Sequence, residues 1–276
     1  MYRPDKTTKQ EVRNSMKHQT PNYGNWIPKT MMQVLWGITG LTLATALAAV
    51  LIWKSRIISI FAFLLFLLMG GMTVYMQLCR RAFSFEGGGV MGQIHQYLLS
   101  KLSWNGKGRL LDIGCGSGAL TIRCAKTWPD AAFTGIDYWG REWNYAREQC
   151  EENARLEQAG PICFLQGDAS GLPFEAGHFD AAVSNFVFHE VKTQPDKRLV
   201  VREALRVVKK GGVFAFHDLF EQHAVYGDMQ EFAEQLRREG ISEVHYEPHT
   251  EQLSCIPAYV RAPWLLNGLG ILYGKK

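Results

Sequence analysis

A chain of 276 residues can form one large domain or two small ones. Its formal charge of +4 is unevenly spread: residues 1–30 hold six lysines and arginines against two acids, whereas residues 82–276 carry a net charge of −4. A folded region with that balance lacks the electrostatic footprint of a nucleic-acid binder, so we expect no such partner. The six cysteines have neither paired nor metal-ligand spacing, which predicts reduced thiols and no metal site.

Two segments, 31–53 and 57–78, contain no charged side chain. A helix of 20 or so apolar residues, at about 1.5 Å per residue, crosses a hydrocarbon core of roughly 30 Å, and both segments reach that length. Because the linker between them is short, the pattern predicts a transmembrane helical hairpin over 31–78, preceded by a basic tail over 1–30. A cleaved signal peptide and a pair of buried soluble helices are the alternatives.

The distribution of charge predicts the orientation of the hairpin. The basic tail precedes the first segment and Arg80-Arg81 follow the second, whereas the turn holds only Lys54 and Arg56. The positive-inside rule therefore places both flanks in the cytoplasm, as parts of an integral membrane protein. The tail would lie beside anionic membrane lipids or in solvent. Small residues spaced by four would form one face of the first helix: Gly40, Ala44 and Ala48. Such a face allows close helix contact, so a homo-oligomer could form through the hairpin.

From there on, short apolar runs alternate with helical patterns. Residues 79–105 are predicted as a connector followed by a first helix over 92–102. Predicted strands then cover 109–113, 133–137, 164–168, 179–185, 213–217, 242–246 and 270–273. Predicted helices cover 120–127, 141–158, 199–209 and 227–240. This alternation predicts an α/β domain over 106–276, with a mostly parallel sheet covered on both faces.

The first strand of this domain runs into a glycine-rich turn. Gly114, Gly116 and Gly118 let the backbone turn sharply and approach a ligand closely. Such strand-to-helix turns hold nucleotide-like cofactors in doubly wound folds. Asp112 makes the turn acidic, which would repel a pyrophosphate and attract a cationic aminoacyl group. A nicotinamide dinucleotide with Asp137 on its ribose is the alternative.

Further features follow in order: strands ending at Asp137 and Asp168, the run Phe179–Asn185, and a helix stopped by Gly211-Gly212. With the glycine turn, this series over 85–276 resembles the class I S-adenosylmethionine-dependent methyltransferases, in particular the small-molecule branch that includes the ubiquinone and menaquinone biosynthesis methyltransferases. The resemblance implies a Rossmann-like, seven-stranded fold whose last strand is antiparallel. It also implies S-adenosyl-L-methionine as the cofactor.

In that family the cofactor lies at the carboxyl ends of the strands, which implies a set of binding residues here. Asp137 would bind the ribose hydroxyls. The aminoacyl end would contact the glycine turn: Asp112, Gly114, Cys115, Gly116 and Gly118. The adenine and the other side of the cofactor would contact five more residues: Tyr138, Asp168, Ala169, Asn185 and Phe186. Each acid could instead cap a helix.

Methyl transfer is an in-line displacement in which much of the catalysis can come from positioning. A base is needed only where the nucleophile carries a proton to lose. His189, just past the fourth strand, and His217 with Asp218, at the end of the fifth, are the candidate acid–base groups. Lining the site without a proton transfer is the alternative for each histidine.

The predicted hairpin bears on the methyl acceptor, because tethering raises the effective concentration of membrane-soluble molecules. We expect a lipophilic small molecule: a quinone or isoprenoid, a lipid headgroup, or a hydrophobic thiol or phenol. Phe186 and Val187 follow Asn185 in place of the Pro-Pro-aromatic sequence typical of nucleobase and glutamine methylation. A soluble acceptor, with the anchor serving localisation only, and a non-catalytic membrane scaffold are the alternatives.

Overall fold

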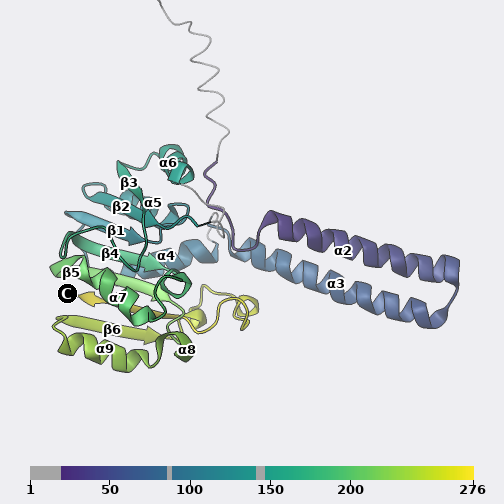
Figure 1. Cartoon of the computed structure of the whole chain (residues 1–276). Coiled ribbons are helices and arrows are strands. Elements are labelled where there is room, and N and C mark those ends of the chain that lie inside the picture. Colours follow the sequence, from purple (N-terminus) through teal and green to yellow (C-terminus); the bar gives the residue numbers. More distant parts are fainter. Residues whose placement is uncertain (1–19, 86–88, 141–146) are drawn as a thin grey trace, which may run out of the picture. The chain divides into compact units, whose positions relative to one another are not determined.

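The computed structural model describes residues 20–85, 89–140 and 147–276, which form two compact units (Figure 1). The sheet unit contains residues 20–23, 97–250 and 268–276. The hairpin unit contains residues 24–96 and 251–267. Most of the predicted basic tail, the glycine run at 86–88 and the start of the predicted helix at 141–158 lie outside the described residues.

The sheet unit is built on a seven-stranded mixed sheet of order β3-β2-β1-β4-β5-β7-β6 (Figure 1). Its strands are β1 (Arg109–Ile113), β2 (Ala132–Asp137), β3 (Ile162–Gln166), β4 (Phe179–Asn185), β5 (Val208–Asp218), β6 (Glu243–Pro248) and β7 (Gly270–Lys275). The first five strands pair in parallel, and β7 runs antiparallel to both β5 and β6. This topology confirms the predicted Rossmann-like fold. The strand order reverses between β1 and β4, the place where such sheets bind ligands.

Helices cover both faces of the sheet: α4 (Val90–Lys101, whose C-terminal part belongs to this unit), α5 (Ala119–Thr127), α6 (Arg147–Leu156), α7 (Lys197–Arg206), α8 (His223–Tyr226) and α9 (Met229–Arg238). Successive strand residues point to opposite faces. Leu111 therefore belongs to a core formed with α7 and α9, whereas its neighbour Leu110 belongs to a second core formed with α5 and the end of α4. Burial of a large apolar side chain contributes about 1.5–3 kcal/mol, so these two cores supply most of the driving force for folding.

Several boundaries differ from the prediction. β3 covers Ile162–Gln166 rather than 164–168, so Asp168 follows the strand, and α7 covers Lys197–Arg206 rather than 199–209. The largest difference is at the start of β5. β5 begins at Val208, whereas the apolar run predicts a strand from Val213, and α7 ends at Arg206. Val208 pairs with Phe179, and the register then shifts so that Val213 pairs with Ala181. Gly211 adopts a φ of 81° inside this irregular stretch. The polar and glycine residues before Val213 hide the first part of the strand because they form a bulge rather than an alternating pattern.

The hairpin unit contains α2 (Lys29–Ala48), a π-helical turn η1 (Ala49–Trp53) and α3 (Arg56–Ala82). Both long helices have the length and apolar composition that crossing a membrane requires. They contact each other through polar groups, with the Thr39 and Thr73 hydroxyl oxygens 2.8 Å apart. The predicted small-residue face does not form this helix–helix contact, since Gly40 and Ala44 are exposed. α3 continues through Ala82, so the first residues of the predicted connector are helical.

Candidate active site

The glycine loop, residues 114–118, links β1 to α5 at the carboxyl edge of the sheet. Gly114, Gly116 and Gly118 have φ values of 74°, 54° and 83°, a region that side chains disfavour. A Cβ on Gly114 would lie 2.2 Å from Val187 Cγ2, so the chain after β4 packs directly on the loop. The backbone N–H of Gly114 also donates to Ile136 O at 2.7 Å, which ties the loop to β2.

Asp112, predicted to face the cofactor, lies beneath the glycine loop. Its carboxylate is 1% exposed and accepts a hydrogen bond of 2.6 Å from the Thr121 hydroxyl on α5. Burial raises the pKa of Asp112 to about 7, against the hydrogen bond from Thr121, which lowers it. The structure thus gives Asp112 a contact that fixes the first turn of α5.

Asp137 ends β2 and holds the glycine loop from the other side. Its two carboxylate oxygens accept hydrogen bonds of 2.8 Å from the backbone N–H groups of Gly116 and Trp139. Burial raises the pKa of Asp137, and these hydrogen bonds oppose that effect. The Trp139 indole donates to Gly116 O at 2.9 Å, a contact that the sequence analysis missed. Tyr138, between the two, is 62% exposed.

Asp168 follows β3, whose last residue, Gln166, pairs with Asp137. The two acids therefore follow neighbouring strands at the same edge. The Ser170 backbone N–H donates to Asp168 Oδ1 at 2.8 Å. Hydrogen bonds from Ser170 and Thr193 lower the pKa of Asp168, although burial alone would raise it. Ala169, next to it, is half-buried.

A second group of polar side chains lies where β4 and β5 end. His189, on the short 3-10 helix η2 (Phe188–Glu190), places its Nδ1 atom 2.5 Å from Asp218 Oδ1. Asp218 is 1% exposed, and its carboxylate accepts backbone hydrogen bonds from Val187, Phe188 and Leu219. These donors and His189 lower the pKa of Asp218 against the effect of burial. The second His189 nitrogen lies 3.5 Å from Glu190.

This pairing controls the charge of His189. Burial alone would lower the pKa of His189, but the Asp218 carboxylate and Glu190 raise it to about 10. The imidazole is therefore a cation at neutral pH, with its Nδ1–H directed to Asp218. Val187 contacts Gly114 and is two residues before His189, which brings this pair beside the glycine loop.

His217 has a different environment from His189. It is 1% exposed, and both ring nitrogens have partners: Asn185 Oδ1 at 3.0 Å and Thr250 Oγ1 at 2.8 Å. Burial lowers the pKa of His217 to about 4, so the ring is neutral at pH 7. Phe186, with a φ of 59°, packs its ring 4.9 Å from the imidazole. Asp218 thus pairs with His189 rather than with its sequence neighbour.

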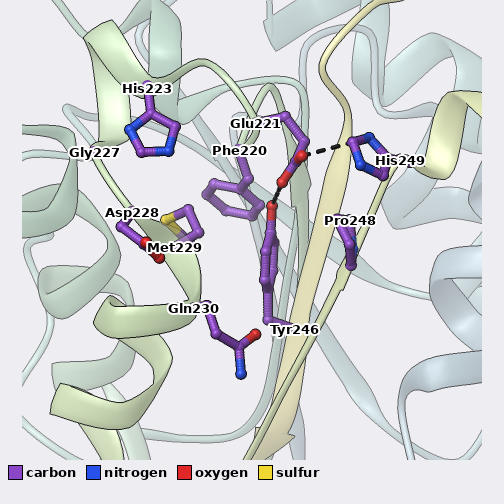
Figure 2. Close-up of a pocket in the computed structure, with 10 residues that line it drawn as sticks. All are labelled: Phe220, Glu221, His223, Gly227, Asp228, Met229, Gln230, Tyr246, Pro248 and His249. Atoms are coloured by element: carbon purple, nitrogen blue, oxygen red, sulfur yellow. Dashed lines mark hydrogen bonds and ion pairs between the residues drawn. The ribbon is translucent and has the colours of Figure 1, made fainter.

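A cavity of about 240 Å³ opens beside the ends of β5 and β6 (Figure 2). Phe220, Met229 and Tyr246 give it apolar surface. Figure 2 shows Glu221 between two partners: it accepts a hydrogen bond from the Tyr246 hydroxyl, and His249 Nδ1 lies 3.4 Å from it. Phe220 also packs against Tyr226, which is next to Asp218; burial and that carboxylate raise the pKa of Tyr226. Two aromatic rings therefore connect the cavity wall with the His189–Asp218 pair.

Comparison with known proteins agrees with this geometry. Residues 111–216 match the family described as a methyltransferase domain. The chain carries a class I S-adenosylmethionine-dependent methyltransferase domain. The matched segment runs from β1 to the middle of β5, so it includes the glycine loop, Asp137, Asp168 and His189.

Two curated relatives of this methyltransferase domain show how far the similarity extends. The chain is 33% identical to O-methyltransferase rstn1 of Aspergillus nomiae over 112 residues, 41% of this chain and 47% of that protein. It is also 33% identical to demethylmenaquinone methyltransferase of Lactococcus lactis over 104 residues, 37% of this chain and 38% of that protein. The chain thus spans less than half the length of these curated relatives.

A solved structure, that of a putative sarcosine dimethylglycine methyltransferase from Galdieria sulphuraria, shares the fold with a TM-score of 0.50. It is 17% identical in sequence, and the match covers 67% of this chain and 84% of that one. At that identity the likeness concerns the fold of the methyltransferase domain alone.

Proposed function

We propose that this protein is a membrane-anchored enzyme that transfers a methyl group from S-adenosyl-L-methionine to a lipophilic small molecule. The observation that carries the proposal is the His189–Asp218 pair, which lies beside a glycine loop of methyltransferase type. The names of the relatives concern several acceptors, and the apolar hairpin of this chain favours a lipophilic one.

The residues at the carboxyl edge fit the proposed cofactor. Gly114, Gly116 and Gly118 give the loop a positive-φ backbone that side chains disfavour, which is the conformation expected of a loop that presents its backbone to a cofactor. Asp137 and Asp168 supply carboxylate oxygens at the ends of β2 and β3 for hydroxyl and amino groups. When bound, the cofactor would supply an activated methyl group on a sulfonium sulfur. Asn185 and Phe186 would line its other side, and Ala169 follows Asp168. Cys115, which the sequence predicts at the cofactor, is instead buried in a cluster with Cys150 and Phe164.

His189 is the residue that we propose moves a proton. Its Nδ1–H is held by Asp218, so in the neutral form of the ring Nε2 is the atom that can take a proton from an acceptor hydroxyl or thiol. Because the pKa of His189 is raised to about 10, turnover should increase with pH toward that value. His217 and Asp218 act as positioning residues in this scheme, since both are fully buried.

The hairpin supports a lipophilic acceptor. α2 and α3 expose apolar side chains along their length, as expected for helices solvated by lipid. The charge pattern of the sequence supports a cytoplasmic position for the methyltransferase domain, because basic residues flank both ends of the hairpin. Within the hairpin unit, the Tyr75 hydroxyl donates to Tyr259 O at 2.9 Å, and the nearby Trp264 is 71% exposed, a typical residue for a membrane interface. The exposed Gly40 and Ala44 face would allow self-association.

The test uses detergent-solubilised full-length protein, methyl-labelled cofactor and a total lipid extract. We expect label in the organic phase, and His189→Gln should reduce its rate of appearance by about 10²–10⁴-fold while cofactor affinity stays within about twofold. His245→Gln, an exposed histidine paired with Glu243, is the matched control and should retain the wild-type rate. Label in water-soluble products alone would move the acceptor to the soluble class. No cofactor binding by the wild type would contradict the enzymatic proposal.

A further inference from the structure

We propose that residues 20–23, here called the N-terminal latch, hold the glycine loop in place and thereby raise the affinity of the protein for its cofactor. This inference rests on the proposed function for the identity of the cofactor. The contacts themselves belong to the sheet unit, which contains the latch, the glycine loop and α6.

Asn153 on α6 is the centre of the latch. Its side chain is 1% exposed, on a helix whose charged residues face solvent. The Asn22 backbone N–H donates to Asn153 Oδ1 at 2.8 Å, and Asn153 Nδ2 donates to Asn22 O at 2.9 Å. One buried amide thus pairs both backbone groups of a residue 131 positions earlier in the chain.

The same amide also holds the glycine loop. Asn153 Nδ2 donates to Ser117 O at 2.9 Å, and the Ser117 hydroxyl donates to Tyr23 O at 3.0 Å. Gln149, one turn earlier on α6, donates to Asn22 O. Ser117 is 4% exposed and lies between Gly116 and Gly118. Without the latch, Ser117 would lose its side-chain partner, and part of the buried Asn153 amide would be left unpaired, which is costly.

Tyr23 adds a side-chain contact to these backbone contacts. Its ring is half-buried, and burial together with the neighbouring Glu157 carboxylate raises the pKa of Tyr23. The next helix, α2, begins at Lys29, so only residues 24–28 separate the latch from the first apolar helix. A shortened protein that lacks residues 1–78 would therefore lose the latch together with the hairpin.

The experiment compares two terminal deletions of the otherwise complete chain in detergent. Deletion of residues 1–19 keeps the latch, and deletion of residues 1–23 removes it. Cofactor affinity is measured by calorimetry, and amide hydrogen exchange is followed over residues 114–121. We expect the shorter deletion to match the wild type. The longer one should raise the dissociation constant about tenfold or more, a loss of about 1.4 kcal/mol that one or two net hydrogen bonds can supply, and should speed exchange.

Asn153→Ala in the full-length chain should reproduce the effect of the longer deletion. A substitution at a buried position can also impair folding. If Asn153→Ala proves unstable, the comparison of the two deletions alone tests the inference. Equal affinity and equal exchange in the two deletions would overturn the inference, as would faster exchange with unchanged affinity. If the wild type does not bind S-adenosylmethionine, the proposed function fails, while the exchange rates still decide whether the latch orders the loop.

Discussion

Asp112 and Asp218 are equally buried, at 1% exposure each, yet their surroundings give the two carboxyl groups opposite properties. Asp112, below the glycine loop, accepts a hydrogen bond from Thr121, and burial raises its pKa to about 7. Asp218, at the end of β5, accepts from three backbone N–H groups and pairs with His189, and its pKa is lowered. Where burial is equal, the number and charge of the donors decide ionisation.

The same rule separates two histidines. His189 has a carboxylate partner that raises its pKa to about 10, whereas His217 has an amide and a hydroxyl partner, and burial lowers its pKa to about 4. The ends of β4 and β5 therefore hold the His189–Asp218 ion pair, whereas Asp112 on β1 is an acid that titrates near neutral pH. Four substitutions test this contrast.

Asp218→Asn should have the largest effect, because it removes the charge that keeps His189 protonated and oriented. At pH 10, where much of His189 is neutral in both proteins, we expect methyl transfer to fall about 10²-fold or more because the ring loses its orientation. The pH at which turnover levels off should move from near 10 toward the ordinary histidine value. The measurement is the initial rate of label transfer between pH 6 and pH 10. The matched control is Asp196→Asn at the N-cap of α7. A wild-type pH profile in Asp218→Asn would refute the pairing.

Asp112→Asn should change how stability depends on pH. An acid whose pKa rises on folding, here from 3.8 to about 7, stabilises fully below the lower value and loses that contribution as pH rises through the upper one. Between pH 5 and pH 8 Asp112 alone should cost about 2 to 3 kcal/mol, and the asparagine variant should lack that loss. Thermal unfolding at both pH values measures it, and parallel pH dependence in the two proteins would show that Asp112 ionises freely.

Gly114→Ala tests the contact between the glycine loop and Val187, which follows β4. The new Cβ would lie 2.2 Å from Val187, at a φ of 74°, so the loop or the chain after β4 must shift. We expect cofactor affinity to fall about tenfold or more. Gly171→Ala, where a Cβ meets no atom within 4 Å, should leave it unchanged. Similar affinities in both variants would mean that Val187 yields easily.

Thr121→Val should have the smallest effect. It removes the hydroxyl that donates to Asp112 while keeping the volume of the side chain. Stability at pH 8 should fall by about 1 kcal/mol, with a smaller loss at pH 5, because the hydrogen bond favours the charged carboxylate. Titration of Asp112 by NMR in the two proteins would measure the change directly, and an unmoved midpoint would argue against the hydrogen bond.

Local patterns in the sequence were sufficient for the fold. Alternating apolar runs and helical segments predicted the strands that the sheet contains, and the uncharged segments predicted two long helices. The early start of β5 was missed, since a bulge interrupts the alternation that identifies a strand. The glycine turn was recognisable because its backbone conformation restricts the residue types that can occupy it.

Side-chain partners depended on the tertiary structure. His217-Asp218 and His189-Glu190 are neighbours in the sequence, but Asp218 pairs with His189 because η2 returns over the end of β5. Asp112 lies two residues before the glycine turn and still points to Thr121, since its strand position faces α5. Asn153 gave no signal among the charged residues of its helix, although it binds a segment 131 residues away. The order of elements and the class of site could be predicted from the sequence, because both follow from local periodicity and backbone sterics. Which acid is charged and which histidine is neutral at pH 7 could not be predicted in this way, because ionisation depends on neighbours that folding brings together.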